Sequence, residues 1–294
     1  MTQNALTGDD VLAAATRMGA VTLLVADLDR MTSYYRDAVT LTVLEQASGR
    51  SVLGRGTTPI VILEHVPGLK HAAPKSAGLF HTAVLFETEA DLATAVYSIA
   101  TRYPNTFTGS SDHLVSKAFY FDDPEGNGVE LYWDRDRTQW SWTHGRVEMS
   151  TLNLDPNEFL RSSLDETAVA TAADRPASIG HVHLSVGRVD AAREFYVNEL
   201  GFETTAELGN SALFVSAGKY HHHMAMNTWN SAGAGPRTPG LGLGLVRIIL
   251  PGADDLGALG ERLDHFRVAT ADDGHTLRFD DPWSNKIEVT AAQP

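Results

Sequence analysis

Histidine is the residue whose placement in this chain first suggests chemistry. Residues 180–184 read Gly-His-Val-His-Leu, and a matching phrase at residues 19–23, Gly-Ala-Val-Thr-Leu, has no histidine. An imidazole can exchange protons near neutral pH and can bind a transition metal. The difference between the two copies indicates that chemistry was placed on one of two related segments.

The absence of cysteine narrows the choice of metal ligands. The 294 residues contain 12 histidines and no cysteine. A transition metal in this protein would therefore be held by histidine, aspartate or glutamate, and no disulfide can form.

Internal repeats predict the elements that must position these histidines. From residues 19 and 180 onward, each half shows a β-rich run, a turn, an amphipathic helix and a second β-rich stretch. The helices end in aromatic pairs that we expect to be core residues, Tyr34-Tyr35 and Phe195-Tyr196.

A second repeat follows in each half. A strand at residues 79–86 precedes a helix near residues 90–101, and a strand at 243–250 precedes a helix near 254–266. Both units end in a hairpin whose turn begins Phe-Asp-Asp-Pro. The chain therefore consists of four strand–helix–strands modules, numbered one to four in order.

The modules define the predicted domain organisation. Residues 1–133 form a first half with modules one and two, and residues 179–294 form a second half with modules three and four. Residues 134–178 are expected to be a polar, irregular linker with a short helix near residues 156–164. The Gly-, Ala-, Pro- and Ser-containing segment 230–240 is expected to be a loop that could cover a cavity.

Composition argues against two kinds of partner. The chain has 37 acidic and 23 basic residues and a net charge of −14, which disfavours binding to nucleic acid or to an anionic membrane. Its apolar runs, such as residues 21–26, are far shorter than the ~18 residues that a membrane-spanning helix needs. The N-terminal residues do not read as a secretory signal, and we expect a cytoplasmic protein.

Hairpin symmetry places two side chains opposite each other in module two. Tyr120 and Glu130 are equidistant from Glu125 in the turn, so they should face each other across the hairpin. In module four the corresponding pair is Arg278 and Glu288. There the carboxylate has a charge partner, so we interpret Glu288 as structural.

Three consecutive histidines lie in a strand expected at residues 220–227, and the strand would place them on two different faces. Period-2 alternation puts His221, His223 and Asn227 on one face, and His222 on the other with Met224 and Met226. The first face suits a polar cavity and the second an apolar layer.

These motifs together resemble the vicinal oxygen chelate superfamily of glyoxalases, bleomycin-resistance proteins and extradiol dioxygenases. The resemblance rests on residues 180–184, Phe195-Tyr196, residues 200–202, the Asp-Pro-x-x-Asn turns and residues 111–116. It is closer still to two-domain catechol 2,3-dioxygenase-like proteins, through residues 214–223 and 227–229. It implies an α+β fold of four βαβββ modules paired into two curved-sheet barrels.

The resemblance also implies where a metal would lie. In the family, the ligands are a His from the first strand of one module, and a His and a Glu from the first and last strands of its partner. Pairing modules two and three, and one with four, gathers His81, Glu130 and His181 into one site and leaves Glu288 alone. Pairing sequence neighbours would give two incomplete sites and an inactive protein. An exchanged homo-oligomer would also complete the triad.

The activity implied is that of an extradiol dioxygenase, which cleaves a catechol-like aromatic diol with dioxygen at Fe(II), or at Mn(II) or another divalent metal. Seven histidines lie in modules two and three. The resemblance implies His223 as acid and base, and we expect Tyr120 and His113 to donate hydrogen bonds to the reacting oxygens. The expected substrate-binding residues are His183, which could also support the ligands, His221, Asn227 and Trp229.

Two alternatives remain at this point. A glyoxalase-type metal-dependent lyase, isomerase or hydrolase is less favoured, because the family's usual second carboxylate ligand is replaced by His181. A non-catalytic small-molecule-binding protein of the resistance type is also possible, since modules one and four have no first-strand histidine.

Overall fold

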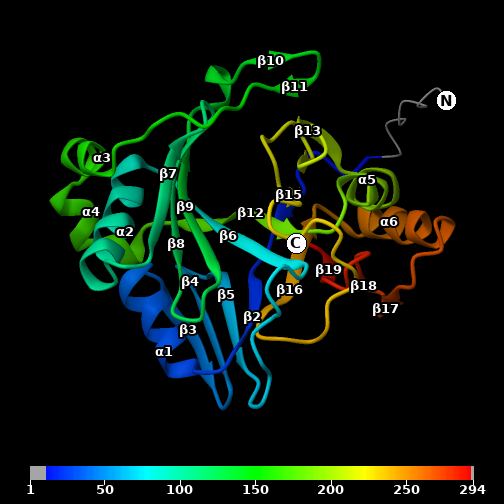
Figure 1. The fold of residues 1–294 in the computed structure, drawn as a ribbon, viewed down its shortest axis with the longest axis horizontal. Coiled ribbons are helices and arrows are strands. Elements are labelled where there is room, and N and C mark those ends of the chain that lie inside the picture. Colours follow the sequence, from blue (N-terminus) through cyan, green and yellow to red (C-terminus); the bar gives the residue numbers. More distant parts are fainter. Residues whose placement is uncertain (1–10, 293–294) are drawn as a thin grey trace.

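Two curved sheets form the framework of the protein (Figure 1). The structure is a computed structural model that describes residues 11–292. The first sheet has the order β17-β18-β19-β16-β2-β5-β4-β3, with β1 also paired to β16, and the second has the order β13-β14-β15-β12-β6-β9-β8-β7.

The strands of the first sheet are β1 (Arg17–Met18), β2 (Val21–Val25), β3 (Thr42–Ala47), β4 (Arg50–Arg55), β5 (Thr58–His65), β16 (Gly242–Leu250), β17 (Ala271–Asp272), β18 (Thr276–Asp280) and β19 (Lys286–Ala291). Those of the second are β6 (Gly78–Phe86), β7 (Phe107–Asp112), β8 (Ser116–Asp122), β9 (Gly128–Asp134), β12 (Ala177–Ser185), β13 (Glu203–Leu208), β14 (Ala212–Ser216) and β15 (Met224–Asn227).

The strand order confirms the predicted pairing of modules. Modules one and four share the first sheet, where β2 and β16 meet antiparallel, and modules two and three share the second, where β6 and β12 meet antiparallel. Within each module the first strand pairs in parallel with the last, as β6 does with β9. The other edge of the first strand is thereby left free to pair with another module. Pairing of sequence neighbours in one sheet is therefore wrong.

Helices cover the outer faces of the sheets. Helices α1 (Leu28–Ser33), α2 (Glu89–Arg102), α3 (Pro156–Ser163) and α4 (Glu166–Ala170) lie on one side of the molecule, and α5 (Val189–Arg193) and α6 (Ala253–His265) on the other (Figure 1). α2 begins where the Thr88 side chain accepts a hydrogen bond from the backbone of Asp91, and it buries Leu92, Val96 and Ile99. No helix in the described part of the chain is long and apolar enough to cross a membrane.

The segment between the halves is more ordered than expected. The predicted helix near residues 156–164 is present as α3, but β10 (Trp142–Thr143) and β11 (Arg146–Val147) also form a hairpin, and α4 follows α3. The hairpin stands above the second sheet in Figure 1. Its position brings residues 146–151 over that sheet.

Two matching hydrogen bonds join modules that are neighbours in sequence. The helical segments after α1 and α5 bury Tyr35 and Tyr196, as predicted for core residues. The Tyr35 hydroxyl donates to Asp123 of module two (3.1 Å), and the Tyr196 hydroxyl donates to Asp281 of module four (2.8 Å). Burial raises the pKa of Tyr35 well above its ordinary value, so the phenol keeps its proton. The Phe-Asp-Asp-Pro turns therefore connect modules that do not share a sheet.

Replacing Tyr35 by phenylalanine should lower the free energy of unfolding by about 1.5–3 kcal/mol, because a buried carboxylate loses a donor. Urea unfolding measures the change. Tyr97→Phe is the control, since Tyr97 is 44% exposed. An unchanged unfolding free energy for Tyr35→Phe would show that this bond does not stabilise the junction.

Candidate metal centre and cavity

Three adjacent strands at the middle of the second sheet bring His81, Glu130 and His181 together. His81 lies on β6, Glu130 on β9 and His181 on β12, and Ala83 on β6 pairs with both Glu130 and His181. All three side chains are buried, with exposed fractions of 6%, 3% and 2%. The site is complete within one chain.

A glycine sets the local geometry of β12. The strand has a register shift between Ile179 and His181, at Gly180. A Cβ atom at Gly180 would collide with the hydroxyl of the buried Tyr132, so a larger residue here would force that ring to move. This explains why the histidine phrase begins with glycine.

The distances within the triad fit a shared metal ion. The Nε2 atoms of His81 and His181 lie 2.9 Å and 3.1 Å from Oε2 of Glu130, and the three ligand atoms lie within 4.8 Å of one another. Two ligands at right angles, each about 2.1 Å from a metal, are about 3 Å apart. The buried Nε2 of His81 has no hydrogen-bond partner among the described residues, despite its short distance to Glu130. A metal ion would satisfy this atom.

Burial keeps the imidazoles around the triad neutral. It lowers the pKa of His181 to about 4 and places the pKa of His183 and of His222 well below the ordinary value. A neutral imidazole is the form that binds a metal or accepts a proton. The site therefore offers uncharged imidazole nitrogens to a metal at neutral pH.

Tyr120 faces Glu130 across the β8–β9 hairpin, as predicted. Its hydroxyl lies 2.7 Å from Nε2 of His113, whose Nδ1 lies 2.7 Å from the backbone oxygen of Ser150. Because a carbonyl only accepts, Nδ1 of His113 donates and its Nε2, in the neutral ring, accepts from Tyr120. Burial raises the pKa of Tyr120 well above its ordinary value. Both residues line the same cavity as the triad.

The predicted alternation at residues 220–227 is wrong in its first half. β15 begins only at Met224, and residues 220–223 form an irregular bend before it. His222 lines the cavity, with its ring centroid 4.1 Å from that of His181. His223 is not among the lining residues; its Nδ1 accepts from the backbone of Ala217, and its ring packs on Tyr220.

His221 connects His222 to an aspartate that the sequence reading missed. Nε2 of His221 lies 2.9 Å from Oδ1 of Asp134, and its Nδ1 lies 2.7 Å from Nδ1 of His222. Since the carboxylate accepts, His221 donates from Nε2 and accepts at Nδ1, so His222 donates from Nδ1. Nε2 of His222 is left with a lone pair. Asp134 follows Glu130 on β9 by four residues, so period-2 alternation could have identified it.

Of the four residues predicted to bind substrate, two line the cavity and two lie behind its lining. His183 lines the cavity, and its Nε2 lies 3.0 Å from the Asn227 amide, which is fully buried and is not a lining residue. His221 is not a lining residue either. Trp229 lines the cavity mouth with 48% of its surface exposed.

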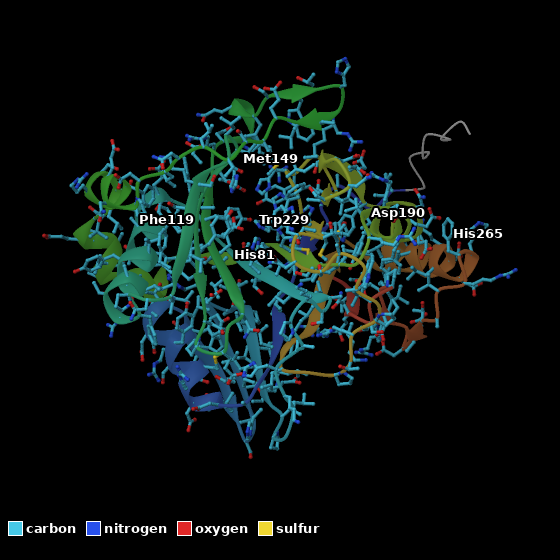
Figure 2. The ribbon with its side chains drawn as sticks, in the orientation of Figure 1. His81, Phe119, Met149, Asp190, Trp229 and His265 are labelled. Atoms are coloured by element: carbon cyan, nitrogen blue, oxygen red, sulfur yellow. The ribbon has the colours of Figure 1, made fainter. Side chains whose placement is uncertain are left out.

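The segment that covers the cavity is not the one expected from the sequence. The loop 230–240 does not line it, because Gly233 bonds to Gly187 and Arg237 bonds to Trp283, which hold the loop elsewhere. Residues 146–151 line it instead. Figure 2 shows Met149 of this segment above Trp229 and His81.

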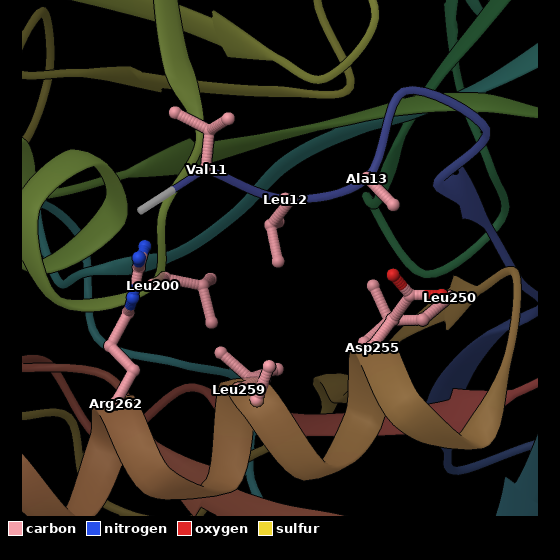
Figure 3. A pocket seen from close by; sticks show the side chains of 9 residues that line it. Val11, Leu12, Ala13, Leu200, Leu250, Asp255, Leu259 and Arg262 are labelled. Atoms are coloured by element: carbon pink, nitrogen blue, oxygen red, sulfur yellow. The ribbon is translucent and has the colours of Figure 1, made fainter. Parts of the chain in front are cut away.

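The cavity has a volume of about 1170 Å³, which is large for a small-molecule site. A second hollow of about 50 Å³ lies between residues 11–13, Leu200 and α6 (Figure 3). Its lining is mostly leucine, alanine and valine and contains no histidine. Only the first of these two hollows carries a group of catalytic side-chain types.

In the first sheet, the glutamate that corresponds to Glu130 is Glu288, and it has no histidine beside it at the first-strand positions. Arg278 pairs with Glu288 in the β18–β19 register, as predicted, and donates to it (2.8 Å), while Arg247 donates from the other side (2.6 Å). The first-strand positions are Ala20 and Leu245. Two guanidinium groups therefore neutralise Glu288. Glu130, its counterpart in the second sheet, faces two imidazoles instead.

Comparisons with known proteins agree with this architecture. The model of the Glyoxalase/Bleomycin resistance protein/Dioxygenase superfamily matches residues 17–131 and 178–289. Catechol-2,3-dioxygenase from Bacillus subtilis (strain 168) is 32% identical over 274 residues, covering 92% of this chain and 95% of that protein.

Two solved structures share the fold. One, from Bacillus subtilis subsp. subtilis str. 168, has a TM-score of 0.67 and 14% identity and covers 97% of this chain and 87% of its own. Glyoxalase I from Zea mays has a TM-score of 0.57 and 15% identity, with 94% and 92% covered. At these identities the likeness is one of fold alone.

Proposed function

The chain belongs to the Glyoxalase/Bleomycin resistance protein/Dioxygenase superfamily, and from this premise we propose that it is a metal-dependent extradiol dioxygenase that cleaves a catechol-like aromatic diol. The observation that carries the proposal is the buried group of His81, Glu130 and His181 with His222 and Tyr120 beside it. The 32% identity to a catechol-2,3-dioxygenase supports the same reaction class.

His81, Glu130 and His181 would hold the metal, and their donor set of two imidazoles and one carboxylate suits Fe(II). Mn(II) or another divalent metal would fit the same ligands. A bound Fe(II) would supply the Lewis acidity that favours deprotonation of a vicinal diol and the redox chemistry that a reaction with dioxygen needs.

His222 would handle protons at its Nε2 atom. The chain of hydrogen bonds from Asp134 through His221 orients the ring and keeps the Nε2 lone pair free. That lone pair can take a proton from a diol hydroxyl and return it later in the reaction. This role, which the sequence reading gave to His223, belongs in our proposal to His222.

Tyr120 and His113 would act on the opposite side of the triad. The Tyr120 hydroxyl, 2.7 Å from His113, stays protonated and carries an oxygen that can accept a hydrogen bond from the substrate. A proton moved onto Nε2 of His113 would reverse this bond and free the Tyr120 hydroxyl to donate to a developing oxyanion.

The histidine at position 181 argues against glyoxalase-type chemistry in this site. Glyoxalase-type chemistry in this family usually uses a second carboxylate ligand, and the triad among the described residues has one carboxylate, Glu130. We therefore favour the dioxygenase over the lyase or isomerase.

The test is oxygen consumption with catechol after anaerobic loading with Fe(II). We expect one dioxygen consumed per diol, with both ¹⁸O atoms of labelled dioxygen found in a ring-opened product by mass spectrometry. Protein that binds metal stoichiometrically but consumes no oxygen with any catechol would contradict the proposal and favour a binding protein.

A further inference from the structure

The cavity is larger than a simple diol requires. Its volume of about 1170 Å³ exceeds the roughly 300–1,000 Å³ of usual small-molecule sites. The triad lies on β6, β9 and β12, whereas the lining extends to β13 and to the segment after β11. A diol held at the triad would therefore leave space toward Leu208 and Met149.

An apolar wall runs from the triad to this space. The Phe80 ring lies 5.4 Å from Trp229 and 4.9 Å from His183, and the Phe214 ring lies 5.9 Å from His183. At the outer end Trp229 and Leu208 keep 48% and 56% of their surfaces exposed. An apolar group placed along this wall would remove their surface from water, which favours binding.

The charges of the cavity disfavour an anion. Within the described part of the chain, Arg146 is the one lysine or arginine of the lining, and its Nη2 is already 2.7 Å from Oε1 of Glu207. The lining also contains Asp122 and Glu148, whereas Glu130 belongs to the metal triad. A substrate carboxylate would lose its hydration without gaining an unpaired cation, and it would face like charges.

Resting on the proposed function, we propose that the substrate is a diol with an uncharged, apolar substituent, which lies along Phe80, Trp229 and Leu208. The cavity binds diols with a carboxylate-bearing side chain more weakly than diols with an apolar one. Trp229 and Glu207 are the residues that determine this specificity.

Two probes of similar size test the proposal by direct binding. We would measure dissociation constants of catechol, 4-butylcatechol and 3-(3,4-dihydroxyphenyl)propanoate by anaerobic calorimetry with Fe(II)-loaded protein. The butyl compound should bind about tenfold or more tightly than catechol, and the propanoate no more tightly than catechol. A propanoate that binds as tightly as 4-butylcatechol would overturn the proposal.

Variants assign the effect to the named residues. Trp229→Ala should remove most of the preference for 4-butylcatechol, and Trp229→Phe should keep it. Glu207→Gln should improve propanoate binding severalfold because Arg146 and Arg193, which both contact Glu207, lose their shared carboxylate partner. Glu203→Gln is the matched control, since Glu203 lies on the same strand and outside the lining. An unchanged preference in Trp229→Ala would also overturn the proposal.

Binding and turnover separate the two proposals. If the binding preference holds and no diol is cleaved, the dioxygenase proposal fails and the cavity preference stands. If catechol is cleaved and the preference is absent, only the substrate class is wrong.

Discussion

Replacing either His81 or His181 by alanine should empty the same metal site. Both Nε2 atoms lie about one hydrogen-bond length from the same oxygen of Glu130, although the histidines lie in different halves of the chain. Loss of a supporting contact around a metal ligand already costs 10–100-fold in affinity, so loss of a ligand should cost more than about 100-fold. Elemental analysis of protein purified without chelator measures the metal content, and oxygen uptake should fall with it.

The matched control for these variants lies in the other sheet. Glu288 occupies the position that corresponds to Glu130 but is paired with Arg247 and Arg278. Glu288→Gln should therefore keep the wild-type metal content, even if it lowers the melting temperature. Metal retained at wild-type stoichiometry in both histidine variants would rule out the triad as the metal site.

Replacing His222 by alanine should lower kcat by about 10²–10⁴-fold, the usual contribution of a positioned acid or base. His222 lines the cavity next to His181. His223→Ala should lower kcat less than tenfold and act mainly on stability, by roughly 1–3 kcal/mol, because it leaves the backbone N–H of Ala217 without its acceptor. Turnover per bound metal compares the two variants.

Measuring turnover per metal separates proton transfer from metal loss, since His222 also touches a proposed ligand. Asp134→Ala should reduce kcat in the same direction by roughly tenfold, because His221 loses the acceptor that sets the tautomer of His222. A larger loss of turnover in His223→Ala than in His222→Ala would return the acid–base role to His223.

Several features could be predicted because they depend on local repetition. Given the ligand pattern that the family resemblance implies, counting possible ligands at equivalent positions favoured the pairing of modules two and three over the pairing of sequence neighbours. The symmetry of a hairpin was enough to oppose Tyr120 to Glu130 and Arg278 to Glu288, as the strand registers confirm. In the hairpins each position follows from the fixed spacing of residues along a strand.

The errors occurred where the chain leaves regular structure. Alternation pointed to His223, but residues 220–223 bend before β15 begins, so their directions depend on what each ring packs against. Residues 146–151 line the cavity, whereas the loop 230–240, which was expected to cover it, does not. The composition of residues 230–240 predicted a loop, but composition does not predict which part of the protein a loop packs against.

By itself, the amino-acid sequence determined the four modules and the residues that face each other across the hairpins, because periodicity and repeat position are properties of the chain. The pairing of the modules and the grouping of His81, Glu130 and His181 also needed the ligand pattern that the family resemblance implies. The tertiary structure alone decided that His222 lines the cavity, that His221 lies within hydrogen-bond distance of both Asp134 and His222, and that Trp229 and Arg146 also line the cavity. Those contacts join segments far apart in sequence, and only packing between them fixes which side chain meets which.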